Sequence, residues 1–132
     1  MKKIVSLMML LIVALPSVAE VIKYKATSFA LKTYDYNRER WTDWTDWETC
    51  NILVVVDSDK DLITVYSQQT QEYDIIEYLG EEEDNGGALV RFNCVDQDGG
   101  KCNVRLRVQN DGQQQLYVDY NDASWVYNVQ LR

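Results

Sequence analysis

Short runs in which apolar and polar residues alternate, separated by turn residues, dominate the chain from residue 20 onward. A period of two is typical of β-strands that bury one face. All six glycines lie in or beside the expected turns, and the only proline, Pro16, lies before these runs, so every backbone N–H within them can join a ladder. The sequence predicts strands at 21–34, 48–57, 62–67, 73–79, 89–96, 102–109, 115–120 and 124–131. The pattern at 73–79 also fits one or two helical turns.

The expected turns fix how these strands pair, because a slip of one residue would move every side chain to the opposite face. The expected pairs are Cys94–Cys102, Arg91–Arg105, Val108–Leu116, Arg107–Tyr117, Arg105–Asp119, Val118–Trp125, Leu116–Tyr127, Val56–Ile63 and Val54–Val65. They keep the apolar residues of one antiparallel meander on one face, so about eight strands must close into a barrel or fold into a β-sandwich. We expect an all-β barrel closed by pairing of 21–34 with 124–131, because open edge strands without proline would invite pairing with other chains.

The first 19 residues have the organisation of a secretory signal peptide. Lys2 and Lys3 form a positively charged start, an apolar run spans 4–15, and small residues precede a cleavage site expected between Ala19 and Glu20. The run is shorter than the roughly 20 apolar residues that a transmembrane helix needs. The sequence thus predicts one exported domain at 20–132, secreted or periplasmic and without a membrane attachment after cleavage.

The formal net charge of −8 narrows the range of partners. Loss of the signal peptide would remove two lysines and make the charge more negative. Such a charge opposes binding to nucleic acid and to anionic membrane surfaces. The chain contains no histidine, which excludes Ser-His-Asp and Cys-His catalysis and removes the usual zinc ligand. Because no catalytic motif stands out among its carboxylates, we expect a non-catalytic protein without cofactor or metal.

Three of the four tryptophans lie close together in Trp41-Thr-Asp-Trp44-Thr-Asp-Trp47. Their rings offer stacking faces, and Asp43 and Asp46 offer hydrogen-bond acceptors, so these five residues form a candidate ligand site for a neutral glycan. In a regular strand Trp41 and Trp47 would share a face and pack into the core, leaving Trp44 outward. With three residues per turn, all three would line up. The alternative is that the rings plug a barrel end or cover the sheet.

Outward-facing arginines are expected on two neighbouring strands. Arg91, Arg105 and Arg107 beside Tyr117 fit either an anion site or an outer sheet face covered by salt bridges and cation–π contacts. We favour the covered sheet face, because Asp119 is expected opposite Arg105 and relieves the repulsion between the cations.

Acidic residues form three further groups with two interpretations each. Glu77 is either buried beside Phe92 as a functional carboxylate or exposed, depending on the register of 73–79. The run at 57–61 fits a hairpin turn better than an EF-hand loop, whose glycine and final glutamate are missing. The run at 81–84 fits a solvated loop tip, with weak calcium binding as the alternative.

An exported protein can form disulfides, and three cysteines leave one thiol over. Cys94 and Cys102 are expected as inward-facing neighbours, a separation that a disulfide can span where the pair is not hydrogen-bonded. We therefore expect a Cys94–Cys102 disulfide, worth about 2–3 kcal/mol. Cys50 shares the face of Ile52 and Val54 and is expected to be a buried free thiol.

The order of the motifs resembles that of small secreted β-proteins of Bacteroides-type bacteria. The resemblance rests on the tryptophan stretch and on the segments 52–57, 63–67, 71–75, 92–96, 116–119 and 124–127. It implies export and a β fold, and it brings no catalytic residues. Lipocalin-like barrels are a looser comparison, since the Gly-x-Trp signature of their first strand is absent.

Together these features predict an exported, non-catalytic binding or interaction domain of unknown ligand, with a neutral glycan as the favoured class. A carrier of a small apolar ligand is the second interpretation, and it requires a barrel cavity lined by Phe92, Trp125 and Tyr127. A carbohydrate-active enzyme is the third, and it requires two carboxylates that face each other across a cleft.

Overall fold

The computed structural model describes residues 20–132, which form nine β-strands. The signal peptide expected at 1–19 lies outside the described residues. The strands are β1 (Val21–Asp35), β2 (Arg40–Trp41), β3 (Glu48–Asp57), β4 (Leu62–Tyr66), β5 (Gln71–Asp84), β6 (Gly87–Asp96), β7 (Lys101–Val108), β8 (Gln114–Asp119) and β9 (Ala123–Leu131). All eight expected strands are present, and β5 is extended throughout rather than helical. Among the described residues, no helix has the length and apolar character needed to cross a membrane.

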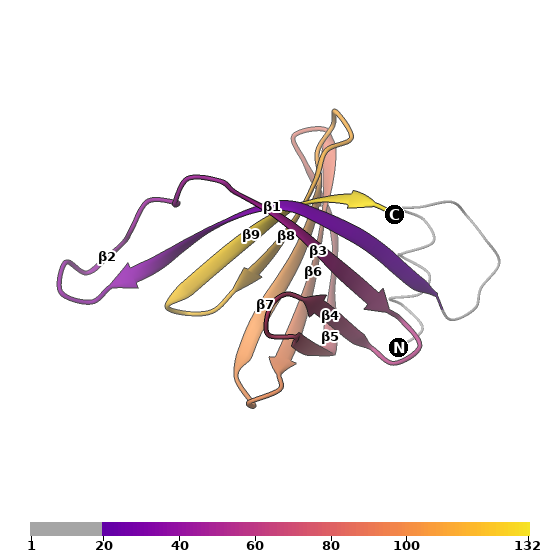
Figure 1. The fold of residues 1–132 in the computed structure, drawn as a ribbon, viewed down its shortest axis with the longest axis horizontal. Helices are drawn as coiled ribbons and strands as arrows, with labels where there is room; N and C mark the ends of the chain where they lie inside the picture. The colour runs from indigo at the N-terminus through magenta and orange to yellow at the C-terminus, as the bar shows by residue number, and fades with distance from the viewer. Residues whose placement is uncertain (1–19) are drawn as a thin grey trace.

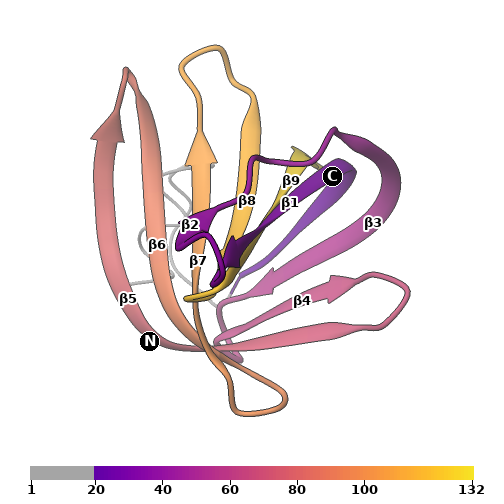
Figure 2. The same ribbon diagram turned by 90° about the vertical axis from the view of Figure 1, so that its left-hand side faces the viewer.

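The sheet closes on itself, which confirms the barrel. Apart from β2, consecutive strands are neighbours from β1 through β3 to β9, and β1 also pairs with β9. The closing pairs include Ala26–Val129 and Leu31–Trp125. Figures 1 and 2 show the resulting antiparallel barrel of eight strands, with the short β2 attached to the far end of β1 outside the closed ring.

Apolar side chains fill the interior of the barrel. Tyr24, Tyr73, Phe92 and Tyr127 come from four different strands, are at most 4% exposed, and belong to one core cluster. Phe92 packs against Tyr78, with ring centroids 5.9 Å apart. The region around Phe92, where a carrier would need a cavity, is thus occupied by side chains.

Most of the expected registers are confirmed, among them Val54–Val65, Cys94–Cys102, Val118–Trp125 and Leu116–Tyr127. The β7–β8 pairing differs by two residues, so Leu106 rather than Val108 lies opposite Leu116. The ladder continues to Gln109, whose amide donates to the Gln113 carbonyl at 2.7 Å, and the turn therefore comprises 110–112 instead of 111–113. Because the shift is even, no side chain changes face.

Two irregularities in β5 decide where Glu77 points. Register shifts against β6 lie between Ile75 and Glu77 and between Tyr78 and Gly80. Ile75 remains inward at 4% exposure, whereas Glu77 is exposed and its carboxylate accepts a hydrogen bond from Asn93 at 2.8 Å. The interpretation of Glu77 as a buried carboxylate is therefore wrong. The two shifts interrupt the alternation of inward and outward side chains, so neither of the two registers considered for 73–79 holds along the whole strand.

The acidic run at 81–84 belongs to β5 and is not the loop tip that the sequence indicated. The turn after it is formed by Asn85 and Gly86, whose φ angles are 49° and 84°. Two consecutive positive φ angles are typical of a two-residue type I′ hairpin, which Asn-Gly favours. This tight turn lets the strand continue to Asp84, so the acidic side chains face solvent and the arginines of neighbouring strands.

Cys94 and Cys102 are cross-strand neighbours, but both thiols are free, so the expected disulfide is wrong. The Asp96 amide donates to the Gly100 carbonyl at 2.8 Å, which marks a hydrogen-bonded pair two residues further along the ladder. Such pairs alternate in antiparallel sheets, so the two cysteines also occupy a hydrogen-bonded position. Side chains lie further apart there than in the non-hydrogen-bonded pairs that disulfides favour.

These thiols should be unreactive in the native protein. Burial raises the pKa of Cys94 to about 12 and that of Cys102 to about 11, so both stay protonated near neutral pH. We expect iodoacetamide to leave both unmodified in the folded protein and to alkylate both after unfolding. Cys50 is the internal comparison, since it is free but only half-buried, with Sγ donating to the Ala26 carbonyl at 3.6 Å. Peptide mapping without reduction measures the result, and a Cys94–Cys102 cross-linked peptide would contradict it.

Candidate functional site

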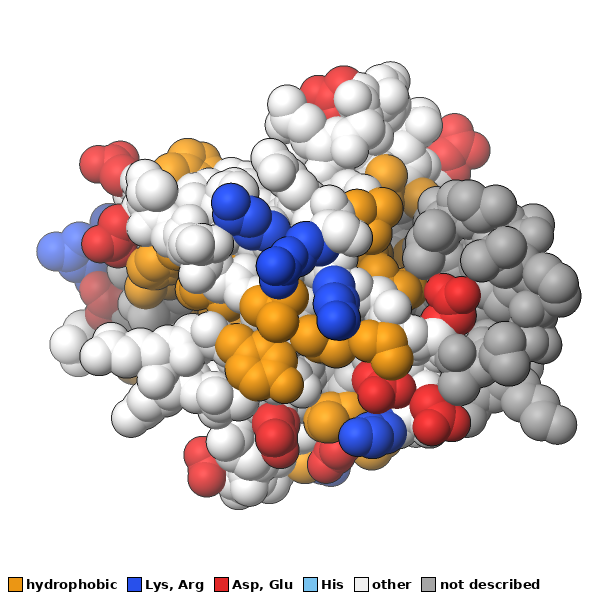
Figure 3. Space-filling model, turned by 45° about the vertical axis from the view of Figure 1, so that its right-hand side comes forward, with side chains coloured by type: hydrophobic (Ala, Val, Ile, Leu, Met, Phe, Trp, Pro, Cys, Tyr) orange, Lys and Arg blue, Asp and Glu red, His pale blue; other side chains and the backbone are white. Residues whose placement is uncertain are grey.

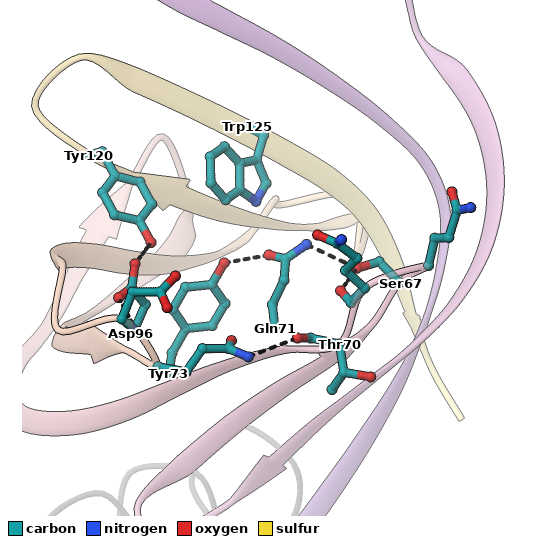
Figure 4. Close-up of a pocket in the computed structure, with 11 residues that line it drawn as sticks. Ser67, Thr70, Gln71, Tyr73, Asp96, Tyr120 and Trp125 are labelled. Atoms are coloured by element: carbon teal, nitrogen blue, oxygen red, sulfur yellow. Dashed lines mark hydrogen bonds between the residues drawn. The ribbon is translucent and has the colours of Figure 1, made fainter.

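Three hairpin loops meet at one end of the barrel. Successive hairpins of a closed meander alternate between its two ends, so the β4–β5, β6–β7 and β8–β9 connections share one end. Between them lies a cleft of about 790 Å³, lined by 67–71, Tyr73, 96–98, Tyr120 and Trp125 (Figure 4). We call this the mouth cleft.

Asp96 is fixed as a hydrogen-bond acceptor in the mouth cleft. Its carboxylate accepts from the Tyr120 hydroxyl at 2.6 Å (Figure 4). It also accepts from the Gly100 amide at 2.7 Å and from the Asp98 amide at 3.0 Å. These bonds hold the pKa of Asp96 below its ordinary value, and the bond from Tyr120 has the largest effect. Burial and the bond to Asp96 raise the pKa of Tyr120. At neutral pH the pair is therefore a carboxylate and a neutral phenol.

Gln71 connects the mouth cleft to the top of the core. Its side-chain oxygen accepts a hydrogen bond from the Tyr73 hydroxyl, and its amide nitrogen donates to Ser67 Oγ at 3.0 Å (Figure 4). The same nitrogen lies 3.5 Å from the Tyr127 hydroxyl and donates to it. The orientation of this amide is thus set by three neighbours.

Gln97 ties two of the loops together across the mouth cleft. Its Nε2 donates to the Thr70 carbonyl at 3.2 Å, and its Oε1 accepts from the Glu72 amide at 2.8 Å. These contacts run from the β6–β7 loop to Thr70 in the β4–β5 loop and to Glu72 at the start of β5. The polar groups of the cleft are therefore positioned before any ligand arrives, which lowers the entropy cost of binding.

Two aromatic rings form a wall of the mouth cleft. Tyr120 and Trp125 flank the β8–β9 turn, with ring centroids 5.4 Å apart and planes inclined by 32°. Trp125 Nε1 is buried and makes no hydrogen bond of normal geometry to the described residues. Burial raises the pKa of Tyr127, and hydrogen bonds from Gln71 and Trp125 oppose this rise, so the Trp125 N–H is directed toward the Tyr127 hydroxyl. Ring faces beside fixed amide and carboxylate groups can stack on a sugar ring and hydrogen-bond its hydroxyls.

Removal of one hydroxyl tests the Asp96 pair. In Tyr120→Phe the carboxylate loses the bond that lowers its pKa most, so we expect the Asp96 pKa to rise toward its ordinary value. A lowered carboxylate pKa contributes stability above the unfolded-state pKa, and this is lost as the pH falls through the folded-state pKa. As the pH falls, the Tyr120→Phe variant should lose this stability at a higher pH than the unsubstituted chain. NMR titration of the Asp96 side-chain carbon measures the shift, and an unchanged pKa would show that Tyr120 does not control it.

The tryptophan stretch leaves regular strand geometry after β2 and runs along the edge of β1. The amides of Thr42 and Thr45 donate to the carbonyls of Thr33 and Leu31 at 2.8 and 2.9 Å. The hydroxyls of the same two threonines accept from the amides of Thr33 and Leu31, both at 3.0 Å. An advance of three residues along the stretch thus corresponds to two residues along β1. The threonines of the two Trp-Thr-Asp units therefore make equivalent hydrogen bonds to the strand.

All three tryptophans of the stretch are exposed, Trp41 and Trp44 by 38% and Trp47 by 50%. The expectation that Trp41 and Trp47 pack into the core is therefore wrong, because the period along β1 is three and not two. The Lys32 ammonium lies 5.3 Å from the Trp41 ring centroid and 4.7 Å from that of Trp44. Trp44 also meets Tyr117 edge-on at 6.2 Å. We call Trp41, Lys32 and Trp44 the outer aromatic row.

The outer aromatic row lies over an apolar spot on the outside of the barrel. Ala30 and Val126 are cross-strand partners on β1 and β9, and they are only 2% and 3% exposed although they lie outside the core cluster. Tyr117, the contact of Trp44, is the partner of Val126 on its other side. Trp44 therefore covers part of the outer sheet face, as the alternative interpretation of the tryptophans proposed.

None of the five residues expected to bind ligand lines the mouth cleft. Asp43 and Asp46 are exposed on the tryptophan stretch, and Asp43 borders a separate hollow of about 300 Å³ beside Arg38 and Arg40. Trp125, which was expected to line a barrel cavity, borders the mouth cleft. The polar residues of the cleft escaped sequence reasoning because they come from three loops far apart in the chain. The closed meander was the feature that could have located the cleft, because it places the loops at 67–70, 97–100 and 120–122 at the same end of the barrel.

The arginines of the outer sheet face are paired with carboxylates, which confirms the salt-bridged interpretation. Tyr117 rather than Asp119 lies directly opposite Arg105, so the Arg105 guanidinium stacks on the Tyr117 ring at 4.0 Å and still reaches Asp119 diagonally. The ion pairs are Arg91–Glu82 at 2.8 Å, Arg105–Asp119 at 2.6 Å and Arg107–Asp84 at 2.9 Å. These cations are therefore engaged within the chain.

The acidic run at 57–61 forms the β3–β4 turn, as favoured from the sequence. The Asp57 carboxylate accepts from the amides of Asp59 and Lys60 at 3.0 and 3.2 Å. Within residues 20–132, no cluster of three or more histidine, cysteine, aspartate or glutamate side chains has a geometry that could hold a metal ion.

Basic and hydrophobic side chains gather on one outer face of the barrel (Figure 3). Lys23 and Lys25 of β1 lie opposite Val55 and Leu53 of β3. Leu53 lies in turn opposite Tyr66, which is 51% exposed. This face lies on the outside of the sheet, whereas the mouth cleft is lined by the carboxylates of Asp96 and Asp98.

No protein-family model, curated protein or solved structure matched the chain.

Proposed function

We propose that this protein is an exported, non-catalytic domain that binds a neutral glycan in the mouth cleft. The observation that carries the proposal is the Tyr120–Trp125 ring pair beside fixed amide and carboxylate groups. The cleft volume of about 790 Å³ suits a small-molecule ligand, since such sites usually measure about 300–1,000 Å³. Export rests on the signal peptide expected at 1–19.

The charge of the cleft supports an uncharged ligand. Asp96 and Asp98 both line it, and the whole chain has a formal charge of −8. An anionic sugar would be repelled, whereas sugar hydroxyls can donate to the Asp96 carboxylate and accept from glutamine amides. Neutral glycans are therefore the ligand class that this set of groups fits best.

The state of Asp96 does not suit the general acid of glycoside hydrolysis. A general acid in that reaction needs a raised carboxyl pKa. The hydrogen bonds to Asp96 lower its pKa instead. A carboxylate held in this state is suited to binding a hydroxyl and not to donating a proton.

The outer aromatic row, extended by Trp47, Asp43 and Asp46, is a second candidate surface for the same ligand class. Three exposed indoles on one stretch favour it. Lys32 already lies over the rings of Trp41 and Trp44, which leaves less free ring face than in the mouth cleft.

A pair of matched variants separates the two surfaces. We expect Trp125→Leu to weaken binding of neutral oligosaccharides about 10- to 100-fold, by analogy with the loss of one base–aromatic stack, while Trp44→Leu leaves affinity unchanged. Isothermal titration against a panel of neutral oligosaccharides measures both, with thermal unfolding as the check on folding. The reverse result would assign binding to the outer aromatic row, and a natural chain that binds no member of the panel would refute the proposal.

A further inference from the structure

A second cleft opens beside the mouth cleft, and its lining is mainly apolar. It measures about 410 Å³ and is bordered by Phe29 and Leu31 of β1 and by Tyr127 of β9. Gln71 and Trp125 line both clefts, so the two meet at these side chains. We call it the apolar cleft.

Leu31 is the most informative residue of the apolar cleft. It shares the inner face of β1 with Phe29, which packs against the core cluster and against Tyr127 at 6.4 Å. Leu31 itself lies directly opposite Trp125 and is 39% exposed. An inward-facing leucine beside a polar cleft leaves apolar surface in water, and covering that surface is favourable.

Charge shows which kind of polar group can lie next to this apolar surface. Lys32 borders the apolar cleft, but its ammonium lies over the rings of Trp41 and Trp44. On the other side, Asp96 and Asp98 face the mouth cleft. An anionic head such as a fatty-acid carboxylate would therefore meet negative charge, whereas a neutral head would not.

We propose that the ligand is amphiphilic, with a neutral sugar head in the mouth cleft and a short alkyl or aryl arm in the apolar cleft beside Leu31. This inference rests on the proposed function and deepens it. It is supported by the continuity of the two clefts at Trp125, whose ring forms part of both walls. A single ligand that spans this junction satisfies the polar groups and covers the exposed apolar surface together.

Pairs of methyl and octyl glycosides test the arm separately from the head. For the β-glycosides of glucose, galactose and mannose, titrated below the micelle concentration of the octyl forms, we expect at least one octyl glycoside to bind at least tenfold more tightly than its methyl counterpart. Leu31→Ser should reduce this gain severalfold and leave the affinity for the methyl glycoside unchanged. Leu131→Ser is the matched control, because Leu131 is also an exposed leucine, 49% exposed, but lies at the other end of the barrel wall. It should change neither affinity.

The other outcomes overturn either the amphiphilic ligand alone or the proposed function as well. Equal affinity for methyl and octyl glycosides, or a gain that persists in Leu31→Ser, overturns the amphiphilic ligand and leaves the proposed function standing. Binding of octanol without binding of any glycoside or of any member of the oligosaccharide panel overturns both and favours a carrier of apolar molecules. Binding of none of these probes and of no member of the panel also overturns both. A change from dimer to monomer in Leu31→Ser, seen by sedimentation, would identify the apolar cleft as a contact between two copies of the chain and overturn the inference.

Discussion

Deletion of 124–132 should abolish cooperative unfolding. β9 is the strand that closes the barrel, since it pairs with β8 on one side and with β1 on the other. Its loss exposes two strand edges and removes Trp125, Tyr127 and Val129 from the interior side of the wall. Truncation of buried residues of this size costs about 2–5 kcal/mol each, which together approaches or exceeds the whole stability of a typical domain, about 5–15 kcal/mol. Thermal unfolding followed by circular dichroism should show no sigmoidal transition.

A shorter truncation provides the control. A chain that ends at residue 130 loses only the Tyr24–Leu131 pair and the bond from the Arg132 amide to the Lys23 carbonyl. We expect it to unfold cooperatively, with a modest decrease in Tm. If the chain without 124–132 unfolds like the full chain, closure through β1 and β9 is not what holds the barrel together.

The fold could be predicted because one local signal repeats along the whole chain. Alternation located the strands, and the short turns fixed which residues face each other, as at Val54–Val65 and Val118–Trp125. An error of two residues at the β7–β8 turn did no harm, since an even shift keeps each side chain on its face. The alternation of residues did not predict the side-chain directions in β5, where two register shifts place Ile75 and Tyr78 on the same, inward side. Such bulges depend on the partner strand and leave little trace in the local pattern.

The candidate site was harder to predict, because it depends on contacts that leave no repeating pattern of residues in the sequence. The tryptophan stretch looked like a strand with two faces, but its threonines bind the edge of β1 every third residue. Cys94 and Cys102 were placed opposite each other correctly, and the missing information was whether that pair is hydrogen-bonded. The mouth cleft depends on side-chain bonds between separate hairpins, from Tyr120 to Asp96 and from Gln97 to Thr70. None of these residues is unusual where it stands in the sequence.

Phe92→Ala should destabilise the protein by about 3–5 kcal/mol, whereas Trp47→Ala should change the free energy of unfolding by no more than about 0.5 kcal/mol. The larger ring is expected to matter less because Phe92 is 1% exposed within the core and Trp47 is 50% exposed. Phe92→Leu, which keeps most of the volume, should cost clearly less than Phe92→Ala. Urea unfolding at equilibrium measures all three. A cost for Trp47→Ala close to that of Phe92→Ala would mean that Trp47 packs into the core after all, and a small cost for Phe92→Ala would mean that the barrel interior around it is open enough to hold an apolar ligand.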